Sequence, residues 1–383
     1  MVKVNKMPLV IFCLFILTGC WDRNEISDIN FVMGMAIDTT DEDKLRVTFQ
    51  WALPTQFSTE GAKGAGSQEN TDFSIEADSL TRAMSMLTEI SPRTPVYSHM
   101  ELIVLGEEVV QKEMENVINV IDREFEVRRT VNIVTAKGKG EDILRSKTPF
   151  ETVQSTGIQK IITMSNQSST FRDVNLNDLF IHVADPDSLA YTPVVETVAQ
   201  SGLEPTETGG QNSWIQVDRV IFFDKFKKQL ELSAEESKAW MYVLGKVEDR
   251  TVMEIPTDKG MLVTSSVSQK SKPTIEMNGD QPSVKYTITE KTSIMDKPID
   301  MTKSEMEKAI EAYLSEKVTE TIKKMQEENH DIFFLRKAIR QQYPQQWKKI
   351  RKNWPETYAS IQFEVHTKVT IEHQNALRKD KIE

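Results

Sequence analysis

The sequence predicts an α+β protein, with three small mixed α/β domains that follow a cleaved lipoprotein signal peptide. Strand-like runs with period two and helix-like runs with apolar residues every three or four positions alternate along the chain. A length of 383 residues favours two or three domains over one. The expected divisions are a signal peptide at 1–19, an N-terminal α/β domain at 20–200, a middle domain at 213–272 and a C-terminal α+β domain with a long helix at 273–383.

The first twenty residues have the features of an export signal. Lys3 and Lys6 form a positive start, and a short apolar run follows from position 7 to 17. The run is too short for a comfortable membrane-spanning helix, which needs about 20 residues. It ends in Leu17-Thr18-Gly19-Cys20, which resembles the lipobox of bacterial lipoproteins.

The lipobox resemblance implies that the Cys20 sulfur receives a diacylglycerol and that cleavage makes Cys20 the mature N-terminus. Two acyl chains hold a protein on a membrane stably, whereas one does so only marginally. The alternative is an uncleaved signal anchor that carries a cysteine by chance. Cys13 and Cys20 are the two cysteines of the chain, so disulfides, thiolate metal sites and cysteine nucleophiles are excluded from its body.

The region before position 200 mixes strands and helices. Asp78 is expected to cap a helix that carries Leu80, Met84 and Leu87 on one face. The other expected elements are strands at 29–37, 45–53, 101–105, 130–136 and 189–198, and helices from about 106 to 120 and at 140–146, 150–164 and 173–182.

A polar stretch at 201–212, rich in Gly, Pro, Thr and Glu, is the expected linker. Beyond it, Ser233 with Glu236 and Thr302 with Glu305 form capping-box patterns that predict helix starts. The first helix should run through about 244 and the second to about 329, with further helix at 333–354. Strands are expected at 217–223, 250–256, 261–268, 283–295 and 361–371.

Signals for catalysis are weak, so we expect no enzyme activity, no cofactor and no metal. The five histidines form no H-x-x-x-H pattern, there is no G-x-S-x-G motif, and the glycines at 61–66 lack the G-K-[ST] of a phosphate loop. Acidic pairs at 107–108 and 235–236 suit helix starts better than an acid/base pair.

Charge also restricts the expected partners. The net charge of −11 argues against a nucleic-acid binder. The basic cluster at 348–352, flanked by Trp347 and Trp354, is best explained as a solvated helix face. Contact of this cluster with anionic lipid headgroups or an acidic partner is the alternative.

Several strings in order resemble the Ger(x)C spore germination lipoproteins, the C subunits of nutrient germinant receptors. The matching strings are Cys20-Trp21-Asp22-Arg23-Asn24-Glu25-Ile26, Gly34-Met35-Ala36-Ile37-Asp38, Ser98-His99 with Gly106, Asp122-Arg123-Glu124-Phe125-Glu126-Val127-Arg128, the segment 136–144, and the segment 230–245 with Ser233, Glu235, Glu236 and Ser237. Near Lys238 the chain departs from the small residue usual in the family. The resemblance covers nearly the whole mature chain.

This resemblance implies a three-domain lipoprotein on the outer face of the spore inner membrane, where it acts with the integral membrane A and B subunits of a receptor that triggers germination in response to nutrients. It implies no catalytic activity and supplies no germinant-binding residues, so Cys20 is the one site residue it identifies. Which germinant is sensed, and whether this subunit touches it, stays open. The alternative classes are a solute-binding lipoprotein of a transporter and a surface-anchored hydrolase.

Overall fold

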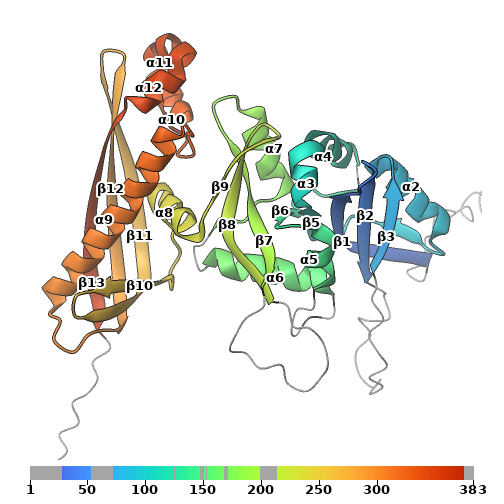
Figure 1. The fold of residues 1–383 in the computed structure, drawn as a ribbon, viewed down its shortest axis with the longest axis horizontal. Coiled ribbons are helices and arrows are strands. Elements are labelled where there is room, and N and C mark those ends of the chain that lie inside the picture. The colour runs from blue at the N-terminus through green and yellow to red at the C-terminus, as the bar shows by residue number, and fades with distance from the viewer. Residues whose placement is uncertain are drawn as a thin grey trace, which may run out of the picture.

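A computed structural model describes residues 28–52, 72–124, 126–146, 151, 153–167, 171–198 and 214–374. Cys20 and its lipobox, the glycines at 61–66 and the expected linker at 201–212 lie outside these residues. The described chain forms two sheets with helices around them (Figure 1). Within it, no helix combines the length and apolar character that a membrane crossing requires.

The first sheet is mixed, with parallel strands in its centre and antiparallel strands at both sides. Its order is β3-β2-β1-β5-β6-β7-β8-β9, and β4 pairs with the start of β1. The strands are β1 (Ile29–Thr39), β2 (Leu45–Ala52), β3 (Asp72–Ala77), β4 (Thr94–Val96), β5 (Leu102–Leu105), β6 (Asn132–Ala136), β7 (Ala190–Val198), β8 (Trp214–Asp224) and β9 (Lys227–Leu232). Strands β1, β5, β6 and β7 are mutually parallel, so their carboxyl ends meet along one edge.

Helices cover both faces of the first sheet (Figure 1). They are α2 (Leu80–Ile90), α3 (Glu107–Lys112), α4 (Met114–Arg123), α5 (Gly140–Arg145), α6 (Gln154–Gln167) and α7 (Leu176–Ala184). Helices α5 and α6 pack on the face of β1 that carries Gly34, where an added Cβ would lie 2.6 Å from Ser155 Cβ. Gly34 therefore permits the close approach of α6 to the sheet.

The second sheet has four strands in the order β10-β11-β12-β13. They are β10 (Val252–Thr257), β11 (Gly260–Asn278), β12 (Gln281–Asp296) and β13 (Gln362–Gln374), and β13 lies parallel to β12. Along β12, exposed and buried residues alternate, as expected for a sheet with one solvated face. The buried face packs against α8 (Ala234–Leu244) and the long α9 (Lys303–Glu327).

Helix α8 lies between the two sheets and joins them (Figure 1). Its Trp240 ring contacts Tyr191 and Phe222 of the first sheet, with ring centroids 5.1 and 5.2 Å apart. The same ring donates a hydrogen bond of 2.9 Å from Nε1 to the carbonyl of Ile332, in the C-terminal part of the chain. Arg340 adds a polar link to Asp185 and Asp187 at the end of α7.

Most of the expected elements are present, and both capping boxes are confirmed at Ser233/Glu236 and Thr302/Glu305. The expected cap at Asp78 is wrong, because Ser79 accepts the hydrogen bond from the Arg82 amide. The expected helix at 333–354 is divided into α10 (Leu335–Gln342), α11 (Pro344–Ile350), η3 (Arg351–Asn353) and α12 (Trp354–Ala359). Proline at 344 cannot donate the bond that would continue α10.

The α+β class is confirmed, whereas the division into three domains stays a prediction. The sheets group the expected middle segment differently, since residues 214–232 complete the first sheet and 252–278 belong to the second. The expected boundary at 272 falls inside β11. Strand pairing between distant segments is a tertiary property that local composition does not reveal.

Candidate binding groove beside helix α9

Ligands of parallel α/β sheets bind at the carboxyl edge of the strands, so this edge of the first sheet is a candidate site. Asp38 lies at the end of β1, Gly106 follows β5, and Gly140 begins α5 after β6. All three belong to the strings on which the family resemblance rests. The structure therefore brings together residues that are far apart in the sequence.

At this edge, a side chain of the protein itself occupies the place that a ligand would take in other parallel α/β sheets. The Asp38 carboxylate accepts hydrogen bonds from the amides of Gly140 (2.7 Å) and Glu141 (2.9 Å), and so caps α5. Burial raises the pKa of Asp38, although these two amides act in the opposite direction. A Cβ on Gly106 would lie 2.1 Å from the Asp38 carboxylate, so only glycine fits there.

The charged side chains near Asp38 also pair with one another within the protein. Glu141 accepts a hydrogen bond of 2.7 Å from Arg46 and pairs with Arg145, which also binds Asp72. These contacts tie α5 to β2 and β3. The arrangement is that of a structural joint, in which Glu141 and Asp72 pair with arginines and Asp38 caps α5.

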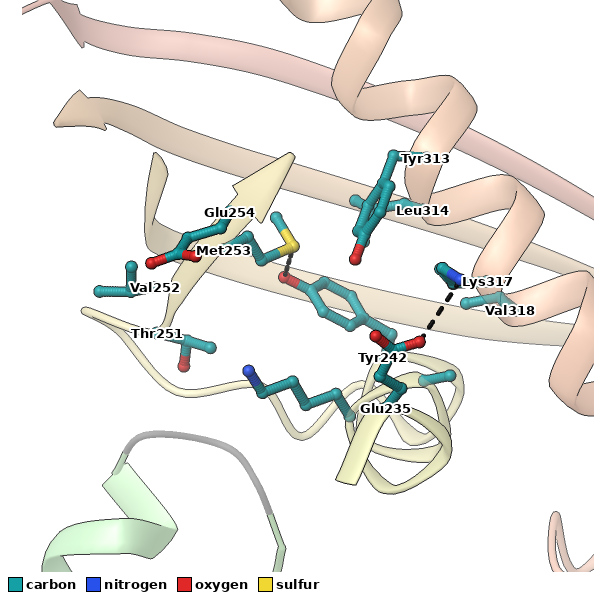
Figure 2. Close-up of a pocket in the computed structure, with 12 residues that line it drawn as sticks. Glu235, Tyr242, Thr251, Val252, Met253, Glu254, Tyr313, Leu314, Lys317 and Val318 are labelled. Carbon is teal, nitrogen blue, oxygen red and sulfur yellow. Dashed lines mark hydrogen bonds and ion pairs between the residues drawn. The ribbon is translucent and has the colours of Figure 1, made fainter. Parts of the chain in front are cut away.

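An open groove runs along α9 in the second half of the chain. Three adjoining hollows of about 440, 740 and 200 Å³ share Glu235 and Lys317 in their linings. Their walls come from α8, β10 and α9. Figure 2 shows the first hollow, with Glu235 and Tyr242 on α8 facing Tyr313, Leu314 and Lys317 on α9.

The floor of this groove is apolar and its rim is charged. The Tyr242 hydroxyl donates to the Met253 sulfur at 3.2 Å, a weak acceptor, as Figure 2 shows. Burial raises the pKa of Tyr242 well above its usual value, so the phenol stays neutral. At the rim, Lys317 pairs with Glu235 at 3.4 Å. Such a lining suits binding of an amphipathic partner or ligand.

The candidate residues from the sequence are placed as follows. Cys20 lies outside the described residues. Acids at 107–108 and 235–236 occupy first helical turns, as expected. His99 contacts the Phe31 ring, and His182 bonds Ser188 Oγ at 2.7 Å. Across the described ranges, no group of three or more His, Cys, Asp or Glu side chains is arranged to hold a metal ion.

The basic cluster at 348–352 covers the end of α11 and the start of η3; its Lys and Arg residues are exposed, and Lys349 pairs with Asp280 at 3.3 Å. Its flanking tryptophans are not part of that surface, because Trp347 and Trp354 are buried against each other, with ring centroids 5.3 Å apart. The groove itself was not predicted. Tyr313 and Leu314 lie in the helix expected to run to about 329, and a helical pattern does not distinguish core from groove wall.

Two family models match the chain in succession. One, described as "Spore germination protein N-terminal domain", matches residues 22–197. The other, described as "Spore germination B3/ GerAC like, C-terminal", matches residues 218–375. Together they cover most of the chain. The break between them runs from the end of β7 into β8, two strands that pair in the first sheet.

Individual relatives agree with the family models. Spore germination protein KC of Bacillus subtilis (strain 168) is 23% identical over 370 residues, covering 91% of this chain and 90% of the relative. Spore germination protein B3 of the same organism is 25% identical over 376 residues, covering 95% and 96%. Neither name points to a transporter.

A solved structure supports the fold. The crystal structure of the GerBC protein matches with a TM-score of 0.57 and 20% sequence identity, over 88% of this chain and 97% of that one. At this identity the likeness concerns the fold alone. With the two family models and the full-length relatives, it leads to one assignment: the chain belongs to the GerAC-like family of spore germination proteins.

Proposed function

We propose that this protein is a non-enzymatic subunit of a nutrient germinant receptor, lipid-anchored through Cys20 on the outer face of the spore inner membrane. The observation that carries the proposal is the succession of germination family models from residue 22 to residue 375, which begins directly after Cys20. The lipobox supports the anchor, and the export signal supports the outer face. Integral membrane A and B subunits are the proposed partners.

The geometry supports a binding role over catalysis. At the carboxyl edge of the first sheet, Asp38 and Glu141 are engaged in capping and ion pairs. The groove beside α9 offers an apolar floor and paired charges. Partner binding is therefore the activity that we assign to the described surface.

Replacing the lipidated residue tests the anchor. In spores, Cys20→Ala should abolish incorporation of labelled fatty acid into the protein and impair germination through its receptor. Cys13→Ala is the matched control, because that cysteine leaves with the signal peptide, and it should change neither readout. Normal labelling and germination of the Cys20→Ala strain would contradict the proposal.

The receptor complex has its own test. Affinity purification of the tagged full chain from detergent-solubilised spore inner membrane should recover two polytopic membrane proteins in constant ratio. Recovery of the chain alone, or of transporter subunits, would oppose the proposed partnership. Turnover of an ester or glycan by the purified chain would oppose the non-enzymatic role.

A further inference from the structure

Glu290 is a buried carboxyl on the central part of the second sheet. It lies on β12 between Gln269 of β11 and Val369 of β13, on the face that packs against α8, and its side chain is almost completely covered. Among the described residues, neither carboxylate oxygen has a hydrogen-bond partner. A buried ionised carboxylate without a partner is strongly unfavourable.

The elements next to Glu290 carry several buried hydroxyls without partners, and the hydroxyl of Ser266 lies close to it. Within the described chain, the hydroxyls of Ser237 on α8, Thr264 and Ser266 on β11, and Thr367 on β13 also lack hydrogen-bond partners. Ser266 is near enough to Glu290 to act on its pKa, but not in hydrogen-bonding geometry. A protonated carboxyl is compatible with the neutral Ser266 hydroxyl, whereas a carboxylate lacks a countercharge.

No cation in the described part of the chain offsets a charge on Glu290. The titratable group that faces it from α8 is the Tyr242 phenol, which is itself neutral. Tyr313 of α9 acts on Tyr242 but not on Glu290. From β11 comes the uncharged Gln269, whose amide holds the Tyr242 carbonyl at 2.9 Å, and β13 contributes Val369.

The same elements form the groove. Tyr242 lines it, and its main chain is tied to β11 through Gln269, next to Glu290. We propose that Glu290 is a buried proton-binding site that controls the packing of α8 on the second sheet, and thereby the shape of the groove beside α9. When Glu290 is protonated, α8 packs closely; when the proton leaves, the new charge draws in water and loosens α8.

The expected range of this switch is mildly alkaline. Burial raises the pKa of Glu290 to about 8, against about 4.3 for a solvated glutamate. The folded chain therefore holds this proton more tightly than the unfolded chain does. Stability from Glu290 is complete below about pH 4 and is lost as the pH rises through about 8.

The test compares the full-length chain, purified in a mild detergent, with its Glu290→Gln variant. Infrared difference spectra between about pH 6 and about pH 9 should show loss of a protonated-carboxyl band in the wild type that is missing in the variant. Across the same range, the thermal midpoint of the wild type should fall, whereas that of Glu290→Gln should change much less. Amide hydrogen exchange of α8, corrected for the intrinsic rate, should rise only in the wild type, with α2 as the internal reference.

Glu364→Gln is the matched control, because Glu364 is an exposed glutamate of the same sheet. It should keep the wild-type pH dependence. If Glu290→Gln fails to fold, Glu290→Met keeps a similar volume without a titratable group and answers the same question. The proposal is overturned if either folded variant retains the wild-type carboxyl band, or if the exchange of α8 is independent of Glu290.

Discussion

Buried polar residues at the carboxyl edge of the first sheet have hydrogen-bond or ion-pair partners, whereas several on the buried face of the second sheet have none among the described residues. At the first, Asp38 caps α5 and Glu141 pairs with arginines. At the second, Glu290 and the buried hydroxyls of Thr264 and Ser266 lack hydrogen-bond partners among the described residues. Satisfied buried polar groups make a region rigid, whereas unsatisfied ones weaken it and make it responsive to its surroundings.

This difference suggests a division of labour within one chain. The first sheet is a scaffold whose joints are made by its own side chains, including the glycines that permit close approach. The second sheet carries the groove beside α9, together with a buried group that can change charge. We therefore expect mutations in the first sheet to act mainly on stability, and those in the second to act on conformation and partner binding.

The largest expected effect is at the scaffold joint. Asp38→Ala leaves two buried amides of α5 without an acceptor and should lower the free energy of unfolding by about 3 kcal/mol. Urea denaturation measures this change. Asp41→Ala, in the exposed loop after β1, is the control and should stay within about 0.5 kcal/mol. Equal losses of unfolding free energy in Asp38→Ala and Asp41→Ala would contradict the scaffold role of this edge.

A smaller effect is expected on stability at acidic pH, through His182 at the junction between the sheets. Burial, together with the Lys337 charge, lowers the pKa of His182 to about 4. The unfolded chain then binds the proton more tightly, so stability is present above about pH 6.5 and is lost as the pH falls towards 4. Urea denaturation at about pH 7 and about pH 5 should show a loss of about 1–2 kcal/mol that His182→Gln reduces. The exposed His366→Gln is the control.

A matched pair of threonines sharpens the comparison further. Thr135 and Thr192 share a buried hydrogen bond of 2.8 Å in the first sheet, whereas the buried Thr264 hydroxyl of the second sheet has no partner in the described chain. Thr135→Val should cost about 1 kcal/mol, because it orphans Thr192. Thr264→Val should be neutral or stabilising by a similar amount. Destabilisation of both by equal amounts in urea would contradict the contrast.

The smallest effect is expected at the basic cluster at 348–352. Lys349 and Asp280 are both largely exposed, so their pair should contribute less than about 0.5 kcal/mol. Lys349→Ala should therefore leave the urea midpoint nearly unchanged, and added salt should remove any difference. A loss above about 1 kcal/mol would show that this cluster has a structural role.

Local elements were predictable because their causes are local. The capping boxes at Ser233 and Thr302 satisfy amides three residues away, and the alternation along β13 follows from the side-chain period of a strand. The cap at Ser79 was missed by one position, since Asp78 and Ser79 are both good caps. The break of the expected helix near Pro344 could have been read from the proline itself.

Long-range contacts were not predictable in this way. Nothing in the composition near 214–232 shows that β8 and β9 complete the first sheet, because a strand's partners are chosen by the whole fold. Likewise, Glu290 stands in a run of alternating residues where its charge suggests exposure. Only the packing of α8 over β12 buries it.

The sequence by itself determined the α+β class, the helix starts and, through strings in order, the family, while the export signal with its lipobox stays a prediction. The confirmed features depend on neighbouring residues, which need no fold. The tertiary structure decided which strands share a sheet, that Asp38 caps α5 at the carboxyl edge of the first sheet, and that a groove opens beside α9. Those features depend on side chains that meet across long separations, where burial alone decides whether a polar group is a cap, a pair or a responsive site.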